Sequence, residues 1–519
     1  MKKRALSIIS ILVLVSMLLS ACVGKSNTPT PSGDNKQAAP KKDSVAIRLL
    51  SDVTTFDPAK SNDINVQMIH YQIHEGLVRE EQDGSLVPAL AEKWEFSSDN
   101  KDMKVTLRQG VKFQNGDPVT ADDVVYSINR AIKEPFTSKM TTTLASAEKI
   151  DDKTVLIKQK FAYPAIIACL ASSSLAIVPK KAVEADPKGF EKKPVGAGPY
   201  MVKEVVTGEK VVLEAFPDYY RGAAKIKTIT YKNLPDVTTA LVALEKGEID
   251  MMTPSQAFTD RQAIIDNPKL KYLEADQAVY FLVGFNNSKG IFTNQKLREA
   301  VSYALDRDSI IQGAVNGMAA PVYAAMVPVI KGFYPKDFKG QEYDPAKAKQ
   351  LLAAAGYPNG FTTTMKVIAA ENYTKPAEII QEQLRQVGIT LKVEPMERAA
   401  WFTDVYNGGN SEIMFHAITA SVLDPDAPVY SFFHSSAADG KGNFFDVKDP
   451  ELDKLIDAGR QTFDPAQRVK IYTQFCEMVR DKAIEVPLFS GKRTQAINKD
   501  LKGVQADPMM KYMVYNYSW

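Results

Sequence analysis

The sequence predicts an α/β protein built from several lobes. Segments of strand-like and helical pattern alternate along most of the chain, which favours α/β lobes. Of the 519 residues, 45% are hydrophobic and 24% are charged, which is ordinary globular composition and excludes a disordered or collagen-like chain. At ~150 residues per domain, this length gives a prior of about three domains.

The chain begins with a pattern typical of a secretory leader. Basic residues 2–4 precede an apolar run at 5–18, which is shorter than the ~20 residues that span a bilayer. We therefore predict a signal peptide over residues 1–21. The run ends in the sequence LSAC, which resembles the bacterial lipobox and makes Cys22 the expected lipidation site. The alternative is an ordinary secretory leader with an incidental cysteine.

Residues 22–43 predict a flexible, lipid-anchored linker. They are almost all small, polar or proline, so they cannot bury enough apolar surface to offset their ordering entropy. A flexible chain of this length reaches about 25 Å on average. The expected location of the protein is the outer face of the cytoplasmic membrane, through a lipid anchor, or the periplasm.

Charge and cysteine content exclude two further classes of protein. Lys and Arg number 64 against 62 Asp and Glu, and three of the positive charges lie in the leader, so we expect no nucleic-acid partner. Three cysteines cannot make a disulfide framework. Cys169 and Cys476 are either two buried thiols or one bridge.

Short segments rich in Val, Ile, Thr or aromatic residues predict strands. These segments are residues 104–107, 154–158, 210–216, 227–231 and 389–394.

Several helices have clear start signals. Thr120 and Asp123 have the spacing of a capping box, and Asp-Pro pairs at 344–345, 449–450 and 464–465 each offer a cap followed by a first-turn proline. Apolar stripes follow these starts, and another stripe covers residues 297–305; we assign all of them to the core.

Six stretches, in order, resemble the extracytoplasmic solute-binding proteins of bacterial ABC importers, in the peptide- and nickel-binding family (family 5). The most specific is LRQGVKFQNGDPVTADDV at 107–124. The others are HEGLV at 74–78 with DG at 83–84 and PALAEKW at 88–94, PVGAGPY at 194–200, GEID at 247–250, FN at 285–286, and LREA with ALDR within 297–307. These motifs are mainly scaffold, and we expect Arg298 and Asp306 to form ion pairs on a helix surface.

The resemblance implies a periplasmic-binding-protein-like (type II) fold in which two lobes close on a ligand and an extra lobe packs on the first. Lobe I would comprise residues 44–80, 195–283 and 496–519, the extra lobe II 81–194, and lobe III 284–495. It also implies a monomer that delivers a peptide or other small-molecule ligand to ABC permease subunits, without a cofactor.

The resemblance places the binding cleft near residue 420, with one departure from the family pattern. In peptide-binding members, a Gly-Trp pair precedes an Asp that binds the peptide's amino terminus. Aligned on Asp424, this chain has Ala417-Ile418 in place of Gly-Trp, and Ser421 in place of the Asp. Either a small misalignment brings Asp424 or Asp426 to the amine site, or the cargo has no free amino terminus there, as in a sugar, a metal chelate or a modified peptide.

Four further residues are ligand-binding candidates. His416 would point from a strand end toward the cleft. Trp401 and Tyr406 offer stacking surface for cargo, with core packing as the alternative. Asn62 is expected to line the wall of lobe I.

The sequence argues against catalysis and against a metal site. No nucleophile-elbow, phosphate-loop or zinc-protease motif is present. His70 and His74 have a spacing that suits a shared metal, but no third ligand is nearby, so we expect helical packing. The predicted function is capture of an oligopeptide or related solute by hinge closure. The alternatives are a non-peptide cargo (a nickel or metal chelate, or an oligosaccharide), and a peptide-sensing receptor that feeds no import.

Overall fold

The structure is a computed structural model that describes residues 42–61, 63–252 and 261–519. The predicted signal peptide, Cys22, the linker up to residue 41, and Asn62 lie outside the described residues.

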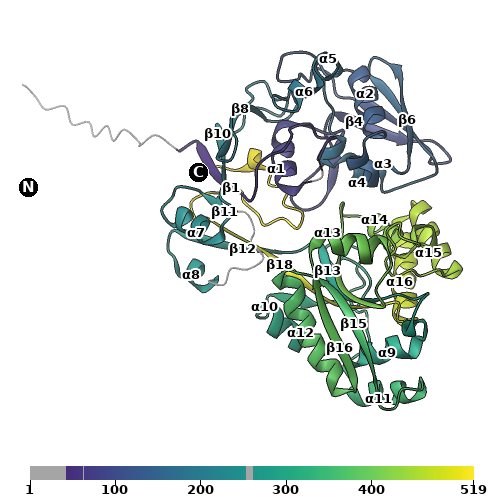
Figure 1. Ribbon diagram of the computed structural model, residues 1–519. Helices are drawn as coiled ribbons and strands as arrows, with labels where there is room; N and C mark the ends of the chain where they lie inside the picture. The colour runs from purple at the N-terminus through teal and green to yellow at the C-terminus, as the bar shows by residue number, and fades with distance from the viewer. Residues whose placement is uncertain (1–41, 62, 253–260) are drawn as a thin grey trace, which may run out of the picture. The chain divides into compact units, whose positions relative to one another are not determined.

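A large mixed sheet runs through most of the described chain (Figure 1). Ten of its strands follow the order β16-β15-β17-β13-β18-β11-β1-β10-β9-β8, and β12 and β14 also pair with β18. β1 is parallel to β10 and β11, and β15 is parallel to β16 and β17. The strands are β1 (Ser44–Leu49), β8 (Tyr200–Val206), β9 (Lys210–Ala215), β10 (Thr228–Asn233), β11 (Met251–Met252), β12 (Leu270–Asp276), β13 (Val279–Phe285), β14 (Ala319–Pro321), β15 (Phe361–Ile368), β16 (Ile389–Met396), β17 (Ile413–Thr419) and β18 (Glu485–Asn498).

The 14-residue strand β18 joins the two halves of this sheet. One half contains β13, β15, β16 and β17, and the other contains β1, β8, β9, β10, β11 and β12. Its first part pairs with β13, from Glu485 to Phe489, and its second part pairs with β12, from Lys492 to Asn498. The chain therefore crosses between the halves twice at adjacent points, once in β18 and once between β12 and β13.

Two smaller antiparallel sheets lie between β1 and β8 in sequence. One has the order β4-β5-β7-β6, and the other pairs β2 with β3. Their strands are β2 (Val78–Glu80), β3 (Leu86–Pro88), β4 (Ala91–Phe96), β5 (Asp102–Leu107), β6 (Leu144–Asp151) and β7 (Thr154–Gln159).

Helices cover the sheets, and Figure 1 shows α12 beside β15 and β16, against which it packs. The α-helices are α1 (Ile64–Ile73), α2 (Ala121–Ala131), α3 (Ser138–Thr141), α4 (Ile166–Leu170), α5 (Lys180–Ala185), α6 (Pro187–Phe190), α7 (Val237–Glu245), α8 (Arg261–Asp266), α9 (Gln295–Ala304), α10 (Arg307–Val315), α11 (Pro345–Ala354), α12 (Glu371–Gln386), α13 (Arg398–Trp401), α14 (Asp426–Phe433), α15 (Pro450–Gln461) and α16 (Pro465–Asp481). A π-helical turn, Phe402–Asn407, follows α13, and 3-10 turns lie at Pro135–Thr137, Ser173–Leu175, Ile291–Thr293, Ser435–Ala437 and Val514–Asn516.

The elements confirm the predicted α/β class and its local signals. The five predicted strands correspond to β5, β7, β9, β10 and β16. Thr120 and Asp123 form both hydrogen bonds of the capping box at α2. Asp344, Asp449 and Asp464 cap α11, α15 and α16.

The expectation for Arg298 and Asp306 is wrong. Arg298 is buried, and its guanidinium donates to the backbone carbonyls of Phe292, Lys482 and Ala483 at 2.7, 2.6 and 2.8 Å. These carbonyls lie in the 3-10 turn before α9 and just after α16, so Arg298 joins two segments. Asp306 instead caps α10, accepting hydrogen bonds from the backbone of that helix.

Candidate functional site

The carboxyl ends of three neighbouring strands meet at one edge of the large sheet. β15 is parallel to β16 and β17, so their last residues, Ile368, Met396 and Thr419, lie at the same edge. Ligands of open α/β sheets bind in the crevice outside such ends. An open hollow with about 1200 Å³ of empty space lies here, which we call the strand-end hollow. It is lined by Gln277, Val279, Phe281, Ile368, Ala369, Ala370, Asn372, Tyr373, Glu397, Arg398, Ala417, Thr419 and Arg493.

Two helix starts contribute to the wall of the strand-end hollow. α12 begins directly after its N-cap, Ala370, whose side chain makes no capping hydrogen bond. α13 begins after Glu397, whose carboxylate accepts the backbone N–H groups of Ala399 and Ala400 at 2.7 and 3.2 Å. The acid in the wall is therefore already engaged, because it satisfies donors at the start of α13.

A layer of aromatic rings lies beside the strand-end hollow. His416 stacks on Trp401 with a centroid distance of 4.3 Å, and on Tyr373, a lining residue, at 6.0 Å. Trp401 is fully buried, and its indole N–H donates to the carbonyl of Lys366. Burial, and secondly the nearby Arg398, lower the pKa of His416 to about 3, so this imidazole is neutral at pH 7. The candidates His416 and Trp401 thus lie together, one layer away from the lining.

The alternation of β17 decides which of its residues face the hollow. Ala417 and Thr419 line it, whereas Ile418 lies between them and packs in the core, opposite Tyr280 of β13. Ser421 follows in the loop between β17 and α14, where it is half-buried.

Asp424 is engaged in a buried ion pair. Its two carboxylate oxygens accept hydrogen bonds from Nη1 and Nη2 of Arg468, each at 2.7 Å, and Oδ1 also accepts the backbone N–H of Asp426. Asp426 in turn contacts Arg460 at 2.9 Å and accepts the hydroxyl of Tyr163 at 2.7 Å. The structure therefore surrounds both acids with protein partners.

Tyr406 lies apart from the lining of the strand-end hollow. Its ring is half-buried and packs against Phe402, Phe432 and Phe444. The structure brings His416 and Trp401 together with the hollow, and it places Tyr406 and Asp424 in other surroundings.

Two arginines that sequence reasoning missed line the strand-end hollow. Arg398 is exposed and lies 5.2 Å from the ring of Phe402. Arg493 is half-buried, and its Nη1 donates to the sulfur of Met510 at 3.0 Å. The position of Arg398 just after a strand could have indicated the site, whereas Arg493 is brought there only by the long reach of β18.

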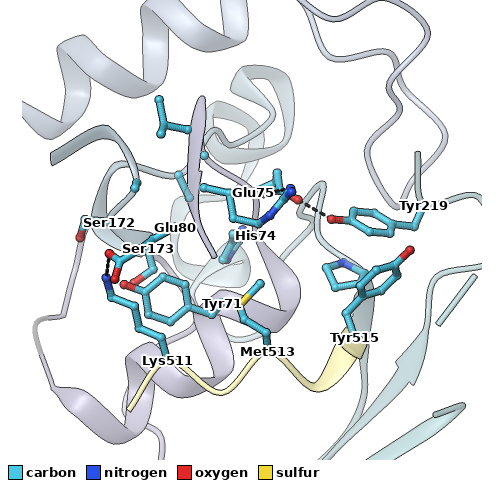
Figure 2. A pocket seen from close by; sticks show the side chains of 16 residues that line it. Tyr71, His74, Glu75, Glu80, Ser172, Ser173, Tyr219, Lys511, Met513 and Tyr515 are labelled. Atoms are coloured by element: carbon cyan, nitrogen blue, oxygen red, sulfur yellow. Dashed lines mark hydrogen bonds and ion pairs between the residues drawn. The ribbon is translucent and has the colours of Figure 1, made fainter. Parts of the chain in front are cut away.

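A second pocket lies around the end of α1 and the start of β2, and Figure 2 shows its charged groups paired with one another. Lys511 forms an ion pair with Glu80 on one side. On the other side, the hydroxyl of Tyr219 donates to Glu75 at 2.6 Å. Burial raises the pKa of Glu75, and Arg79 opposes this shift. Because these groups satisfy one another, this pocket offers less to a ligand than the strand-end hollow does.

His70 in α1 and His74, the C-cap of that helix, pack in the protein interior, as expected. Their rings lie 5.7 Å apart, and each ring bonds through Nε2 to a backbone carbonyl, that of Thr55 for His70 and that of Phe56 for His74. Burial lowers the pKa of His70 to about 3 and that of His74 to about 4, so both are neutral at pH 7. Within residues 42–61, 63–252 and 261–519, no group of three His, Cys, Asp or Glu side chains could hold a metal ion.

Cys169 and Cys476 are both free and buried. Burial raises the pKa of each thiol, so both remain protonated and unreactive at neutral pH. Of the two alternatives for these residues, separate buried thiols are confirmed.

No helix in the described part of the chain has both the length and the apolar character needed to cross a bilayer.

The chain belongs to family 5 of the bacterial extracellular solute-binding proteins. The family model "Bacterial extracellular solute-binding proteins, family 5 Middle" matches residues 85–440, more than half of the chain. The family predicted from the six motifs is therefore confirmed.

Similar proteins cover nearly the whole chain. The glutathione-binding protein GsiB of Salmonella typhi is 28% identical over 88% of this chain and 91% of its own. The oligopeptide-binding protein AppA of Bacillus subtilis is 28% identical over 99% of this chain and 98% of its own. The structure of HbpA2 from Haemophilus parasuis has a TM-score of 0.83 at 26% identity and covers 92% of this chain and 99% of its own. The predicted periplasmic-binding-protein-like fold is confirmed by this similarity.

Proposed function

We propose that this protein captures an oligopeptide or a related small solute in the strand-end hollow and delivers it to an ABC permease. The observation that carries the proposal is the lining of this hollow, because it combines aromatic and apolar surface with arginines from two different elements, α13 and β18. GsiB and AppA are named for binding glutathione and oligopeptides, which supports a peptide-like cargo. We expect the protein to act as a monomer and to release its cargo chemically unchanged.

The proposed mechanism is hinge closure between lobe I (44–80, 195–283 and 496–519) and lobe III (284–495), with lobe II (81–194) packed on lobe I. The two adjacent crossings, in β18 and between β12 and β13, are suitable hinges because few backbone bonds must turn there. Cargo that contacts both lobes would favour the closed state by its differential affinity.

A non-peptide cargo is the second candidate, and Ser421 favours it. In the alignment on Asp424, this serine takes the place of the Asp that neutralises an amino terminus in peptide-binding members. A serine hydroxyl can bond an ammonium group without neutralising it, and an unpaired buried charge is costly. Such a cargo could be a metal chelate, an oligosaccharide or a modified peptide. A receptor that senses a peptide without feeding import would have the same fold.

We further propose that Cys22 carries a lipid that anchors the protein to the outer face of the cytoplasmic membrane. The leader pattern and LSAC sequence support this anchor. Cells expressing the Cys22→Ser chain should fail to incorporate radiolabelled fatty acid into the protein, whereas wild-type cells should do so. Equal labelling of both chains would exclude lipidation at this residue.

The cargo proposal is tested by thermal unfolding of the purified protein with panels of peptides, N-acetylated peptides, oligosaccharides and metal chelates. A ligand at 100 times its Kd adds about 2.7 kcal/mol of stability, which gives a readily measured rise in Tm. We expect at least one class to stabilise the protein. Stabilisation by free but not N-acetylated peptides would favour an amine-binding site despite Ser421. No stabilisation by any class would contradict the proposed function.

A further inference from the structure

We infer that the cargo carries a carboxylate or an equivalent anionic group, and that Arg398 and Arg493 bind it in the strand-end hollow. This inference rests on the proposed function and adds the charge of the substrate class.

Neither arginine forms an ion pair within residues 42–61, 63–252 and 261–519. Arg398 is exposed, and its contacts are with the ring of Phe402 and the side chain of Tyr373, neither of which carries a negative charge. Arg493 donates to the sulfur of Met510, a weak acceptor, and its buried Nε has no hydrogen-bond partner among the described residues. A half-buried arginine without an ion-pair partner has lost hydration that its neighbours replace only in part, and a bound anion would supply the missing interaction.

Glu397, which precedes Arg398, and Asp507, which acts on Arg493, both accept hydrogen bonds from backbone groups. The carboxylate of Glu397 accepts two backbone N–H groups at the start of α13. Asp507, whose negative charge acts on Arg493, accepts the backbone N–H groups of Met509 and Lys511. The charged groups of the lining are therefore two arginines and one engaged glutamate.

Two further features favour a negative ligand over a positive one. The 16-residue helix α12 starts at the hollow, and its N-cap, Ala370, supplies no side-chain acceptor. The positive end of its dipole adds to the field of the arginines. The exposed Glu371 in the first turn of this helix opposes that field, but it is not among the residues that line the hollow. On β17, the residues that line the hollow are Ala417 and Thr419, neither of which is acidic.

The two arginines come from different parts of the large sheet. Arg398 begins α13, directly after β16, whereas Arg493 lies where β18 pairs with Ala275 of β12. An anion held by both guanidinium groups would contact both parts of the sheet at once. The proposed hinge closure needs a cargo that makes such contacts. Arginine suits this role because its planar fork binds a carboxylate through two parallel hydrogen bonds.

The test compares matched acidic and neutral probes on the wild-type protein by calorimetry. The probes are trialanine with trialanine amide, and glutathione with its diethyl ester. We expect loss of the carboxylate to weaken binding on the order of 100-fold, since a charge-assisted pair of hydrogen bonds is lost. Equal affinities within a pair that binds would overturn the inference and leave the proposed function standing. If none of these probes and no member of the wider panel binds, both the proposed function and the inference fail.

Three variants assign the effect to residues. Arg398→Gln and Arg493→Gln should each weaken binding of the acidic probe at least tenfold and leave that of its neutral partner nearly unchanged. The control is Arg385→Gln, an exposed arginine in the last turn of α12 that pairs with Glu382; it should bind as wild type. If Arg493→Gln does not fold, the binding measured for Arg398→Gln, a variant at an exposed position, decides whether the arginines hold the carboxylate. The inference would be overturned if Arg398→Gln reduced the affinity for both probes of a pair equally, or for neither of them.

Discussion

Arg468 and Asp424 form a buried, bidentate ion pair in which two parallel hydrogen bonds of 2.7 Å join the guanidinium to the carboxylate. Arg468 lies in the first turns of α16, and Asp424 lies in the loop before α14, so the pair fixes this loop against a helix. The same carboxylate caps the start of α14 through the backbone N–H of Asp426. We interpret the pair as structural support for the loop that follows β17.

Asp424→Asn should therefore destabilise the protein. An asparagine retains an acceptor for the cap but leaves the Arg468 charge buried and unpaired, which typically costs about 3–5 kcal/mol. Urea unfolding followed by circular dichroism measures the change. Asp439→Asn, which removes an exposed partner of Lys448, is the control and should leave stability unchanged. An Asp424→Asn protein as stable as wild type would contradict this role.

Glu485 should make stability depend on pH. The side chain is buried at the start of β18, where it accepts the hydroxyl of Tyr280 at 2.7 Å, and burial raises its pKa from about 4.5 to about 8. The folded state thus binds this proton more tightly than the unfolded state. The contribution of Glu485 to the free energy of unfolding should be largest below pH 4.5. It should fall by roughly 3–5 kcal/mol as the pH rises to 8.

Glu485→Gln should remove this component, because the amide is neutral at every pH. Measured by denaturant unfolding at pH 5, 6, 7 and 8, the variant should gain stability relative to wild type as pH rises. Glu477→Gln, on the exposed face of α16, is the control and should follow wild type. Parallel pH profiles for wild type and Glu485→Gln would show that the carboxyl group is not held protonated.

Gly360 should tolerate a side chain far less well than Gly356. Both have positive φ, +76° and +91°, so alanine strains each by about 1–2 kcal/mol. A Cβ on Gly360 would also lie 1.8 Å from the carbonyl oxygen of Gly388, whereas a Cβ on Gly356 meets nothing within 4 Å. We expect Gly360→Ala to cost at least about 2 kcal/mol more in urea unfolding. Equal losses for the two variants would contradict this close approach of the segments before β15 and β16.

Tyr163 should contribute to stability through its bond to Asp426. Its hydroxyl donates to Oδ2 of Asp426 at 2.7 Å, and both residues are buried. Tyr163→Phe removes this donor without changing the ring, so we expect a loss of about 1–3 kcal/mol in thermal or urea unfolding. Tyr343→Phe, on an exposed ring, is the matched control and should show no change. A Tyr163→Phe protein indistinguishable from the control would mean that water replaces the hydroxyl without cost.

The local elements were predictable because their signals lie within a few residues of one another. The capping box at Thr120 and the Asp-Pro start at Asp344 each specify a helix start from adjacent side chains. Two of the residues singled out from the sequence, His416 and Trp401, lie next to the strand-end hollow, whose role as the binding site stays a proposal.

The lining itself depends on long-range pairing that no local pattern encodes. Ala417 faces the hollow and Ile418 does not, because the register of β17 on β13 sets their direction. Arg493 reaches the site only through the path of β18. Arg298 looked like a surface charge in its helix and is buried because a segment 185 residues away lies across it. The ligand-binding roles of Ser421, Asp424, His416, Ile418, Trp401 and Tyr406 stay predictions.

Small-angle X-ray scattering, with and without a solute that raises the Tm, tests the central claim most directly. If the protein closes around its cargo, the radius of gyration should fall on saturation and return when the solute is dialysed away unaltered. An identical scattering profile with and without a tightly bound solute would contradict capture by closure.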